Sequence, residues 1–258
     1  SLKVKGLINI QFIEYGDKIY VIEVNPRSSR TVPYLSKVTG IPMVELATKA
    51  SLGYPLRDMG FGVGLYRKSK YVFVKVPVFS FEKLPLVDTG LGPEMKSTGE
   101  VLGVGLTTPE ALYKGMLGAG YVFPKTGNVL ITVADSNKQE IIPLASRFSD
   151  LGFDIYATPG TALALHSNYI AAHVLRPISE SKPNIEDLIR NREINVIINT
   201  PTKGRIQERD GFKIRRLAAE YSIPCITSLD TAKVFLDSIE LDMNEKSVEI
   251  YSMEEILK

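Results

Sequence analysis

The alternation of apolar and polar residues changes character along the chain and divides it into two regions. In residues 1 to about 120, short strand-like and helix-like runs are separated by stretches rich in proline and glycine. From about residue 121 onward, apolar strand-like runs alternate with helical runs at a regular spacing. Such alternation is typical of a doubly wound α/β domain built on a parallel sheet. The pattern therefore predicts an α/β chain with two domains, residues 1–120 and 121–258.

The same pattern predicts the individual elements. In the second region, strands are expected at 129–134, 153–157, 173–176, 195–200 and 224–228. Helices are expected between them at 138–150, 161–168, 184–191, 211–221 and 230–240. In the first region we expect helices at 32–39, 42–52 and 110–117, a strand at 71–79 and a structured loop at 90–99. A short amphipathic segment ends the chain.

The first region opens with two alternating runs, 7–13 and 18–25, which predict an antiparallel hairpin. If a three-residue loop joins them, Gln11 opposes Val21 and lies diagonal to Glu23. One face of this hairpin is then wholly apolar and is expected in the core; it carries Ile8, Ile10, Phe12, Tyr20, Ile22 and Val24.

The opposite face of the hairpin gathers oxygen donors. Gln11, Glu23 and Asn25 lie on it, and Arg27 follows directly. Hard cations such as Mg²⁺ prefer oxygen ligands, and arginine binds phosphoryl oxygens through a planar fork. From the residues alone, a polar strand end with a solvated glutamate fits this pattern at least as well as a cation site does.

Composition narrows the classes of function. With 31 basic and 29 acidic residues the net charge is only +2, which argues against sequence-independent binding of nucleic acid. The single cysteine, Cys225, permits no intrachain disulfide, is expected in a buried strand, and favours a reducing, cytoplasmic setting. No apolar run approaches the ~20 residues that cross a membrane. The first residues resemble the interior of a longer polypeptide, without a signal peptide.

Two motifs in the first region resemble a known family. The run Ile-Glu23-Val-Asn25-Pro-Arg27-Ser-Ser-Arg30-Thr-Val-Pro, twelve residues after Gln11, resembles the metal-binding strand of ATP-grasp ligases. The following Lys-Val-Thr-Gly-Ile-Pro and the stretch Leu-Gly-Pro-Glu-Met-Lys-Ser-Thr-Gly-Glu-Val-Leu-Gly at 91–103 are similar to carbamoyl-phosphate synthetases, near the end of their large subunit.

The resemblance implies an ATP-dependent, glutamine-hydrolysing ligase that makes carbamoyl phosphate for pyrimidine and arginine biosynthesis. Gln11, Glu23 and Asn25 would hold Mg²⁺ or Mn²⁺, the first two also contacting ATP, and Arg27 and Arg30 would act on phosphate or carbamate. The remainder of the large subunit and a glutaminase small subunit are the implied partners. The phosphate-binding lysines, glycine-rich loop and adenine pocket of such enzymes are missing from this chain, so we expect it to be inactive alone.

The second region is similar to the methylglyoxal-synthase-like domain that ends these subunits and binds allosteric effectors. Three of its strand-to-helix loops are rich in hydroxyls, and although helix capping explains any one loop, three at one sheet edge favour a phosphate site. The resemblance implies a nucleotide such as UMP or IMP as effector. The implied contacts are Thr132, Lys138, Thr158, Thr161, Asn199, Thr200 and Thr202, with Arg176 where bacterial relatives carry a lysine.

Two other functions remain open at this point. A methylglyoxal-synthase-like lyase needs a carboxylate and a histidine near a triose phosphate. Asp135 is available for it, but His166 and His173 are expected to be structural. A stand-alone regulatory or interaction module is the other alternative, and a pure interaction module would respond to neither nucleotides nor divalent metals. The identity of the effector, the oligomeric state and the pathway served are not specified by the sequence.

Overall fold

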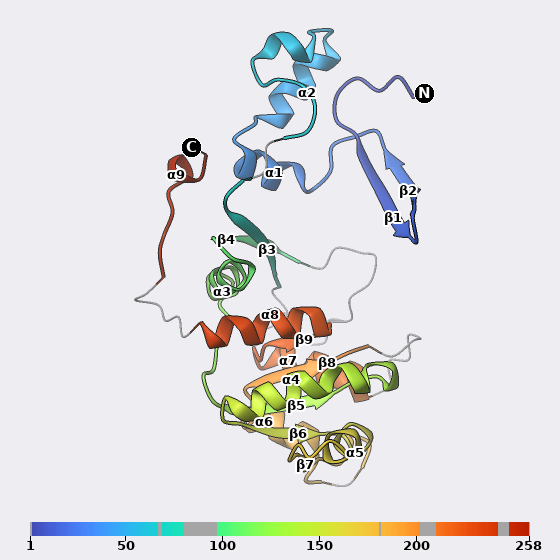
Figure 1. Cartoon of the computed structure of the whole chain (residues 1–258), viewed down its shortest axis with the longest axis vertical. Helices are drawn as coiled ribbons and strands as arrows, with labels where there is room; N and C mark the ends of the chain where they lie inside the picture. The colour runs from blue at the N-terminus through green and yellow to red at the C-terminus, as the bar shows by residue number, and fades with distance from the viewer. Residues whose placement is uncertain are drawn as a thin grey trace. The chain divides into compact units, whose positions relative to one another are not determined.

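The computed structural model describes residues 2–66, 69–79, 97–180, 182–201, 210–241 and 248–257. The chain forms two compact units, one of Ser1–Lys70 with Glu249–Lys258 and one of Tyr71–Val248 (Figure 1). The boundary expected near residue 120 lies inside the second unit, and as a boundary between domains of different kinds it stays a prediction. The expected loop at 90–99 lies mostly outside the described residues.

The first unit combines a hairpin with short helices. Strands β1 (Asn9–Tyr15) and β2 (Lys18–Asn25) pair antiparallel, and helices α1 (Val32–Thr39) and α2 (Met43–Ser51) follow, with a 3₁₀ turn, η1 (Leu56–Met59). Helix α1 ends at Gly40, whose φ of 68° is the left-handed conformation that glycine adopts without strain. The C-terminal helix α9 (Met253–Leu257) contacts α1, so both ends of the chain belong to this unit.

The hairpin register differs from the predicted one. Tyr15 pairs with Lys18 across a two-residue turn, and a β-bulge between Gln11 and Phe12 shifts the pairing once more. As a result Gln11 lies directly opposite Glu23, and the prediction that it opposes Val21 is wrong. Turn length and bulges set register without leaving a mark on the hydrophobic pattern, which explains the error.

The apolar face of the hairpin is not buried, contrary to expectation. Phe12 is 56% exposed and Ile22 61%, and only Val24 of the expected set is half-buried. The main partner of each strand among the described elements is the other strand, so the apolar side chains have no second layer to pack against. The exposed members of the set are Ile8, Ile10, Phe12, Tyr20 and Ile22.

The second unit contains the predicted doubly wound sheet. Its five strands are all parallel and are arranged in the order β7-β6-β5-β8-β9. The strands are β5 (Gly127–Thr132), β6 (Phe153–Ala157), β7 (His173–Val174), β8 (Val196–Asn199) and β9 (Cys225–Ile226). The helices are α4 (Lys138–Asp150), α5 (Pro159–His166), α6 (Ile185–Arg190), α7 (Asp210–Glu220) and α8 (Leu229–Glu240).

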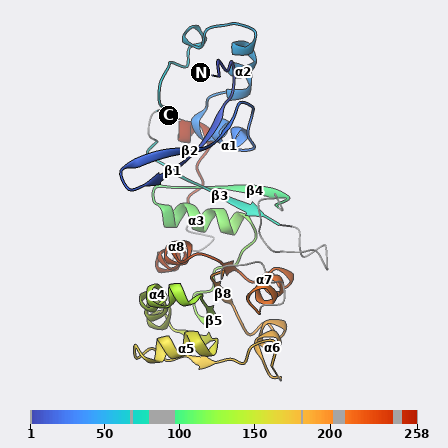
Figure 2. The same ribbon diagram turned by 90° about the vertical axis from the view of Figure 1, so that its right-hand side faces the viewer.

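The helices cover both faces of this sheet. Helices α4, α5 and α8 pack on one face in a core that includes Phe148, Leu165 and Phe235. Helices α6 and α7 pack on the other face in a second core that includes Ile189 and Ile214 (Figure 2). Strand order reverses between β5 and β8, because the chain extends the sheet first on one side of β5 and then on the other. Ligands bind at this kind of reversal in open α/β sheets.

A second antiparallel hairpin, not predicted as such, precedes this sheet. Strands β3 (Val72–Val78) and β4 (Gly99–Gly105) pair, and helix α3 (Thr108–Gly118) packs on them. The contact is very close: a Cβ added to Gly103 would lie 1.9 Å from the carbonyl oxygen of Ala111. Only glycine fits there.

Cys225 packs against the second core, as expected for a strand residue. Burial raises the pKa of its thiol to about 12, and the neighbouring Arg215 only partly offsets that rise. Thiolates are the reactive form of cysteine, so this side chain is chemically quiet in the folded protein.

We expect Gly103→Ala to lower the free energy of unfolding by about 2–3 kcal/mol, because the new methyl group forces helix α3 away from strand β4. Urea unfolding followed by circular dichroism measures the change. Gly99→Ala is the matched control in the same strand, since its Cβ would lie 3.8 Å from Val78. Equal losses in the two variants would show that the close approach is not the cause.

We expect Cys225 to react with a disulfide reagent at pH 8 roughly 1,000-fold more slowly in the folded than in the urea-unfolded protein. The folded protein holds the thiol proton more tightly, so this group's contribution to stability is complete below the unfolded pKa. That contribution is then lost as pH rises from about 9 to about 12. Similar rates in the two states would contradict the burial of the sulfur.

Candidate functional site

The polar face of the first hairpin brings the expected metal ligands together. Gln11 pairs with Glu23 and Asn9 with Asn25, so these four side chains share one face. The Asn25 amide donates a hydrogen bond to the Glu23 carboxylate. The face therefore carries one carboxylate flanked by amide groups.

This set of donors suits a hard cation that brings other ligands with it. Among the described residues there is no cluster of three or more His, Cys, Asp or Glu side chains able to hold a metal. One carboxylate with amide oxygens from Gln11 and Asn25 completes only part of a coordination shell. Mg²⁺ commonly fills the rest with water and phosphate oxygens. The hairpin thus fits a metal–phosphate complex better than a bare ion.

The two candidate arginines follow the hairpin on the turn into helix α1. The Arg27 backbone N–H donates to the Asn25 carbonyl at 2.8 Å, and its guanidinium donates to the Ser28 carbonyl at 3.0 Å. Arg30 is exposed directly before Thr31, the residue that begins α1. Both arginines lie close in sequence to the polar face of the hairpin, but their guanidinium groups are not hydrogen-bonded to Glu23 in this structure.

A second polar site lies at the carboxyl edge of the parallel sheet, where strand order reverses. Thr132 ends β5, Asn199 ends β8, and the two residues are paired in the sheet register. The Thr158 hydroxyl lies 3.4 Å from that of Thr132 and 3.3 Å from that of Thr161. Three strand-to-helix connections therefore meet at this edge, as the sequence predicts.

Two of the threonines also hold the loop after β5. Thr161 accepts a hydrogen bond from the Val133 backbone at 3.4 Å, and Thr200 accepts one from the Ala134 backbone at 2.9 Å. Both side chains are buried. Simple helix capping does not explain Thr158, which begins helix α5 without a side-chain capping bond.

Lys138 brings a positive charge to this edge. Its ammonium group lies 3.0 Å from the position that a Cβ on Gly160 would occupy, above the first turn of α5. The positive end of that helix and the lysine together favour an anion. Lys138 pairs with Asp135 at 2.6 Å, but the Asp135 side chain is 93% exposed, so the pair is weak and readily exchanged.

The other predicted contacts are less well placed. Arg176 is exposed in the loop after β7, which lies two strand positions from β5. Thr202 lies outside the described residues. The structure thus brings Thr132, Lys138, Thr158, Thr161, Asn199 and Thr200 to one sheet edge and leaves Arg176 at its margin.

Sequence reasoning missed Arg215 on helix α7. Its Nη1 donates to the Asn199 Oδ1 at 2.5 Å, sixteen residues away along the chain. The only sequence signal was an arginine next to Ile214, a core position of an amphipathic helix. Asp210, at the start of the same helix, accepts a hydrogen bond from the Ile178 backbone at 3.0 Å and holds the loop after β7.

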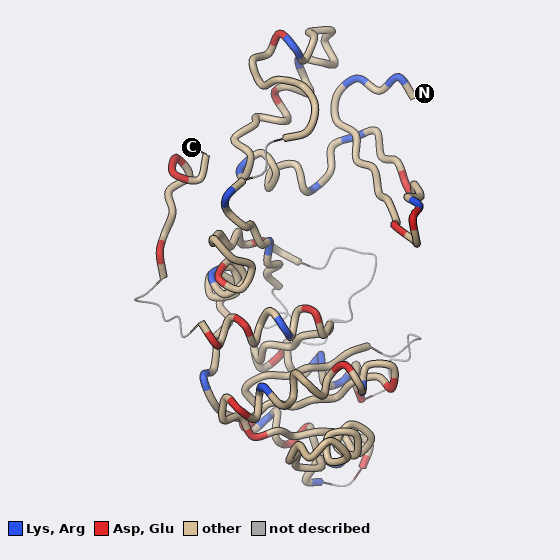
Figure 3. Tube along the Cα trace, in the orientation of Figure 1, with Lys and Arg blue, Asp and Glu red and all other residues tan. Residues whose placement is uncertain are grey.

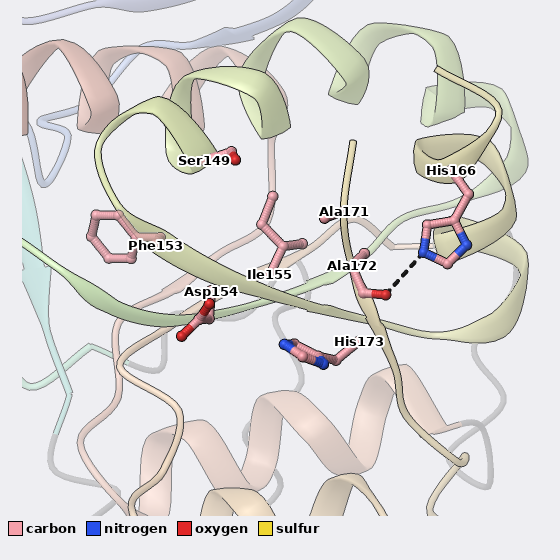
Figure 4. A pocket seen from close by; sticks show the side chains of 8 residues that line it. All are labelled: Ser149, Phe153, Asp154, Ile155, His166, Ala171, Ala172 and His173. Carbon is pink, nitrogen blue, oxygen red and sulfur yellow. Dashed lines mark hydrogen bonds between the residues drawn. The ribbon is translucent and has the colours of Figure 1, made fainter. Parts of the chain in front are cut away.

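Both histidines border a different cavity, near the edge strand β7. This cavity has a volume of about 270 Å³ (Figure 4). The His166 ring nitrogen lies 2.9 Å from the Ala172 carbonyl, and His173 stacks on Tyr156 with ring centroids 4.8 Å apart. His166 lies at the opposite end of α5 from Thr158, so it is not near the threonine cluster formed by Thr132, Thr158 and Thr161. The geometry gives a lyase no histidine beside a phosphate site.

Charge and hydropathy add little to these sites. Lys, Arg, Asp and Glu are interspersed along the trace (Figure 3), and the net charge is only +2. Within the described ranges, no helix has the length and apolar character needed to cross a bilayer.

Two family models match parts of this chain. Residues 1–59 match the carbamoyl-phosphate synthase L chain ATP-binding domain, and residues 140–227 match the MGS-like domain. The chain is also similar to a solved methylglyoxal synthase from Elizabethkingia anophelis NUHP1. That likeness is weak, with 16% identity, a TM-score of 0.38, and coverage of 45% of this chain and 80% of the other.

Relatives with longer chains match almost the whole sequence. The carbamoyl phosphate synthase large chain of Lachnoclostridium phytofermentans is 54% identical over 93% of this chain. Those of Clostridium botulinum and Clostridium perfringens are each 50% identical, over 97% and 98% of it. The chain spans only 22–24% of the length of these relatives. The chain is thus similar to one section of these carbamoyl phosphate synthase large chains, with a match to their ATP-binding domain model followed by a match to the MGS-like domain model.

Proposed function

We propose that this chain contributes metal ligands to an ATP site that phosphorylates carbamate, and that its second unit binds a nucleotide effector. The observation that carries the proposal is the meeting of Lys138, four threonines and Asn199 at the strand reversal of an MGS-like domain. The names of the full-length relatives support carbamoyl phosphate as the product.

In the catalytic part, the hairpin presents its polar face to a metal–ATP complex. Glu23 would hold the cation, Mg²⁺ or Mn²⁺, and Gln11 and Asn25 would supply neutral oxygens beside it. A cation held there would supply neutralisation of phosphate charge and alignment of the transferring group. Arg27 and Arg30 on the next turn orient carbamate or phosphate. Such a reaction depends on positioning and charge neutralisation, which are what these side chains provide.

This part of the site needs the rest of a larger protein. The proposed partners are the remainder of the large subunit, which would supply the other ATP contacts, and a glutaminase small subunit that would deliver ammonia from glutamine. The product would feed pyrimidine and arginine biosynthesis in the cytoplasm. The exposed apolar face of the hairpin supports this proposal, because the remainder of the large subunit would provide a layer that covers it. We propose that the isolated chain has no ligase activity.

In the regulatory part, we propose that a nucleotide such as UMP or IMP places its phosphate between Lys138 and the start of helix α5. Hydroxyls of Thr132, Thr158 and Thr161 line the same edge. Asn199, on the far side of the reversal, would face the nucleoside. Arg176, at the margin of this site, and Thr202, outside the described residues, remain proposed contacts.

The two competing functions have less support. A methylglyoxal-synthase-like lyase lacks a histidine at the threonine cluster, since His166 and His173 border another cavity. If the second unit were only a protein-interaction module, the convergence of a lysine, a helix N-terminus and several hydroxyls would have no explanation.

Titration calorimetry of the purified chain with UMP and then IMP tests the regulatory proposal. We expect saturable binding that Thr158→Val weakens about 10-fold, because the variant keeps the shape of the side chain and removes a hydroxyl that no capping bond uses. Thr126→Val is the control, since Thr126 precedes β5 at the opposite edge of the sheet. Absence of binding to both nucleotides by folded protein would refute this proposal.

Glu23→Gln, introduced into the full-length large subunit, tests the catalytic proposal. We expect ATP-dependent carbamoyl phosphate formation to fall by about 100-fold or more, with partial recovery at high Mn²⁺, because the single carboxylate of the face is lost. Glu14→Gln on strand β1 is the control at the exposed turn of the same hairpin. Full activity of the Glu23 variant would remove the hairpin from the metal site.

A further inference from the structure

Asn199 is held in an unusual way for a buried amide at the end of a strand. The residue is 1% exposed, and its Oδ1 accepts a hydrogen bond from Arg215 Nη1 at 2.5 Å. Gly211, one turn earlier on helix α7, borders both groups. A Cβ there would lie 3.4 Å from Asn199 Nδ2 and 3.5 Å from Arg215 Nη1. Helix α7 therefore brings the guanidinium into contact with the amide.

The guanidinium decides which way the amide faces. An arginine side chain only donates hydrogen bonds, so the amide atom that it contacts must be the oxygen. The Nδ2 group of Asn199 is then fixed as the free end of the amide. Within the described part of the chain, no hydrogen bond from this Nδ2 to a protein acceptor occurs. A buried N–H donor without a partner costs stability unless something else accepts from it.

Arg215 also differs from its neighbours in charge pairing. Arg216, the next residue, pairs with Glu220 at 2.9 Å, and Arg190 pairs with Glu186 at 2.8 Å. Among the described residues Arg215 forms no ion pair and contacts the neutral amide instead. Helix α7, which carries Arg215, packs against strands β8 and β9. Within the described ranges, no carboxylate pairs with this cation at the carboxyl edge.

We infer that Arg215 is the positioning residue of the effector site: it fixes the Asn199 amide so that its N–H group is presented to a ligand oxygen. This inference rests on the proposed effector site and specifies its chemistry on the nucleoside side. The ligand recognised there carries an acceptor, a carbonyl or hydroxyl oxygen of the base or ribose. Lys138 and the N-terminus of α5 attract the phosphate, and the Asn199 N–H group donates a hydrogen bond to the base or ribose.

A double-mutant cycle with UMP and IMP in titration calorimetry tests this inference. We expect Arg215→Met to weaken nucleotide binding about 10-fold in the chain with Asn199, because the amide is free to turn. In an Asn199→Ala background the same change is expected to have less than about a 2-fold effect. Arg216→Met is the matched control, with the same loss of charge on the same helix, and is expected to leave the affinity within about 2-fold.

Asn199→Asp gives a readout that a merely structural role would not produce. The new carboxylate pairs with Arg215, so we expect an unchanged or higher melting temperature together with loss of nucleotide binding. The gain in melting temperature is expected to disappear when Arg215→Met is added.

The outcomes separate the inference from the proposed function. If Arg215→Met weakens binding equally in both backgrounds, or not at all, the positioning role is wrong and the effector site stands. If the unmodified chain binds neither nucleotide, the proposed effector site is wrong. In that case the melting temperatures of the Asn199→Asp pair still decide whether Arg215 controls the amide, and equal values with and without Arg215 overturn it.

Discussion

Parallel pairing of β5 with both β6 and β8 is the constraint on which the second unit depends. Val129, Leu130 and Ile131 of β5 are fully buried, because helices cover both faces of the sheet. Parallel strands can be joined only by crossovers, so every carboxyl end lies at the same edge. With both faces closed, that edge is the place where polar side chains from separate connections can meet. The sheet therefore brings Thr132 and Asn199 together through backbone pairing alone.

The first unit has no comparable support. Its hairpin depends on a two-stranded ladder whose apolar side chains remain exposed, and isolated ladders of this size are marginal in water. The β-bulge beside Gln11 nevertheless gives the polar face a definite geometry, because it sets Gln11 against Glu23. The two candidate sites thus differ in kind. One is assembled by a closed core, whereas the other lies on an exposed two-stranded hairpin.

Much of the second unit could be predicted from the sequence, because buried strands and amphipathic helices leave strong periodic signals. Helix α4 and strand β6 lie where the pattern places them. Strand β4 was missed because Gly103 and Gly105 weaken its strand signal, and they are there to admit helix α3. The convergence of Gln11 with Glu23, and of the threonine loops, followed from strand positions. Their register did not, and Arg215 was missed, since both depend on contacts that no local pattern encodes.

The double use of Thr161 and Thr200 has a consequence for selectivity. A hydroxyl oxygen that already accepts a backbone N–H has its own proton left to give. Each hydroxyl can then donate its own proton to a bound ligand. An oxyanion can accept that proton, whereas an ammonium group has no lone pair with which to accept it. Through the two hydroxyls that anchor its loop, this edge of the sheet suits an anionic ligand better than a cationic one.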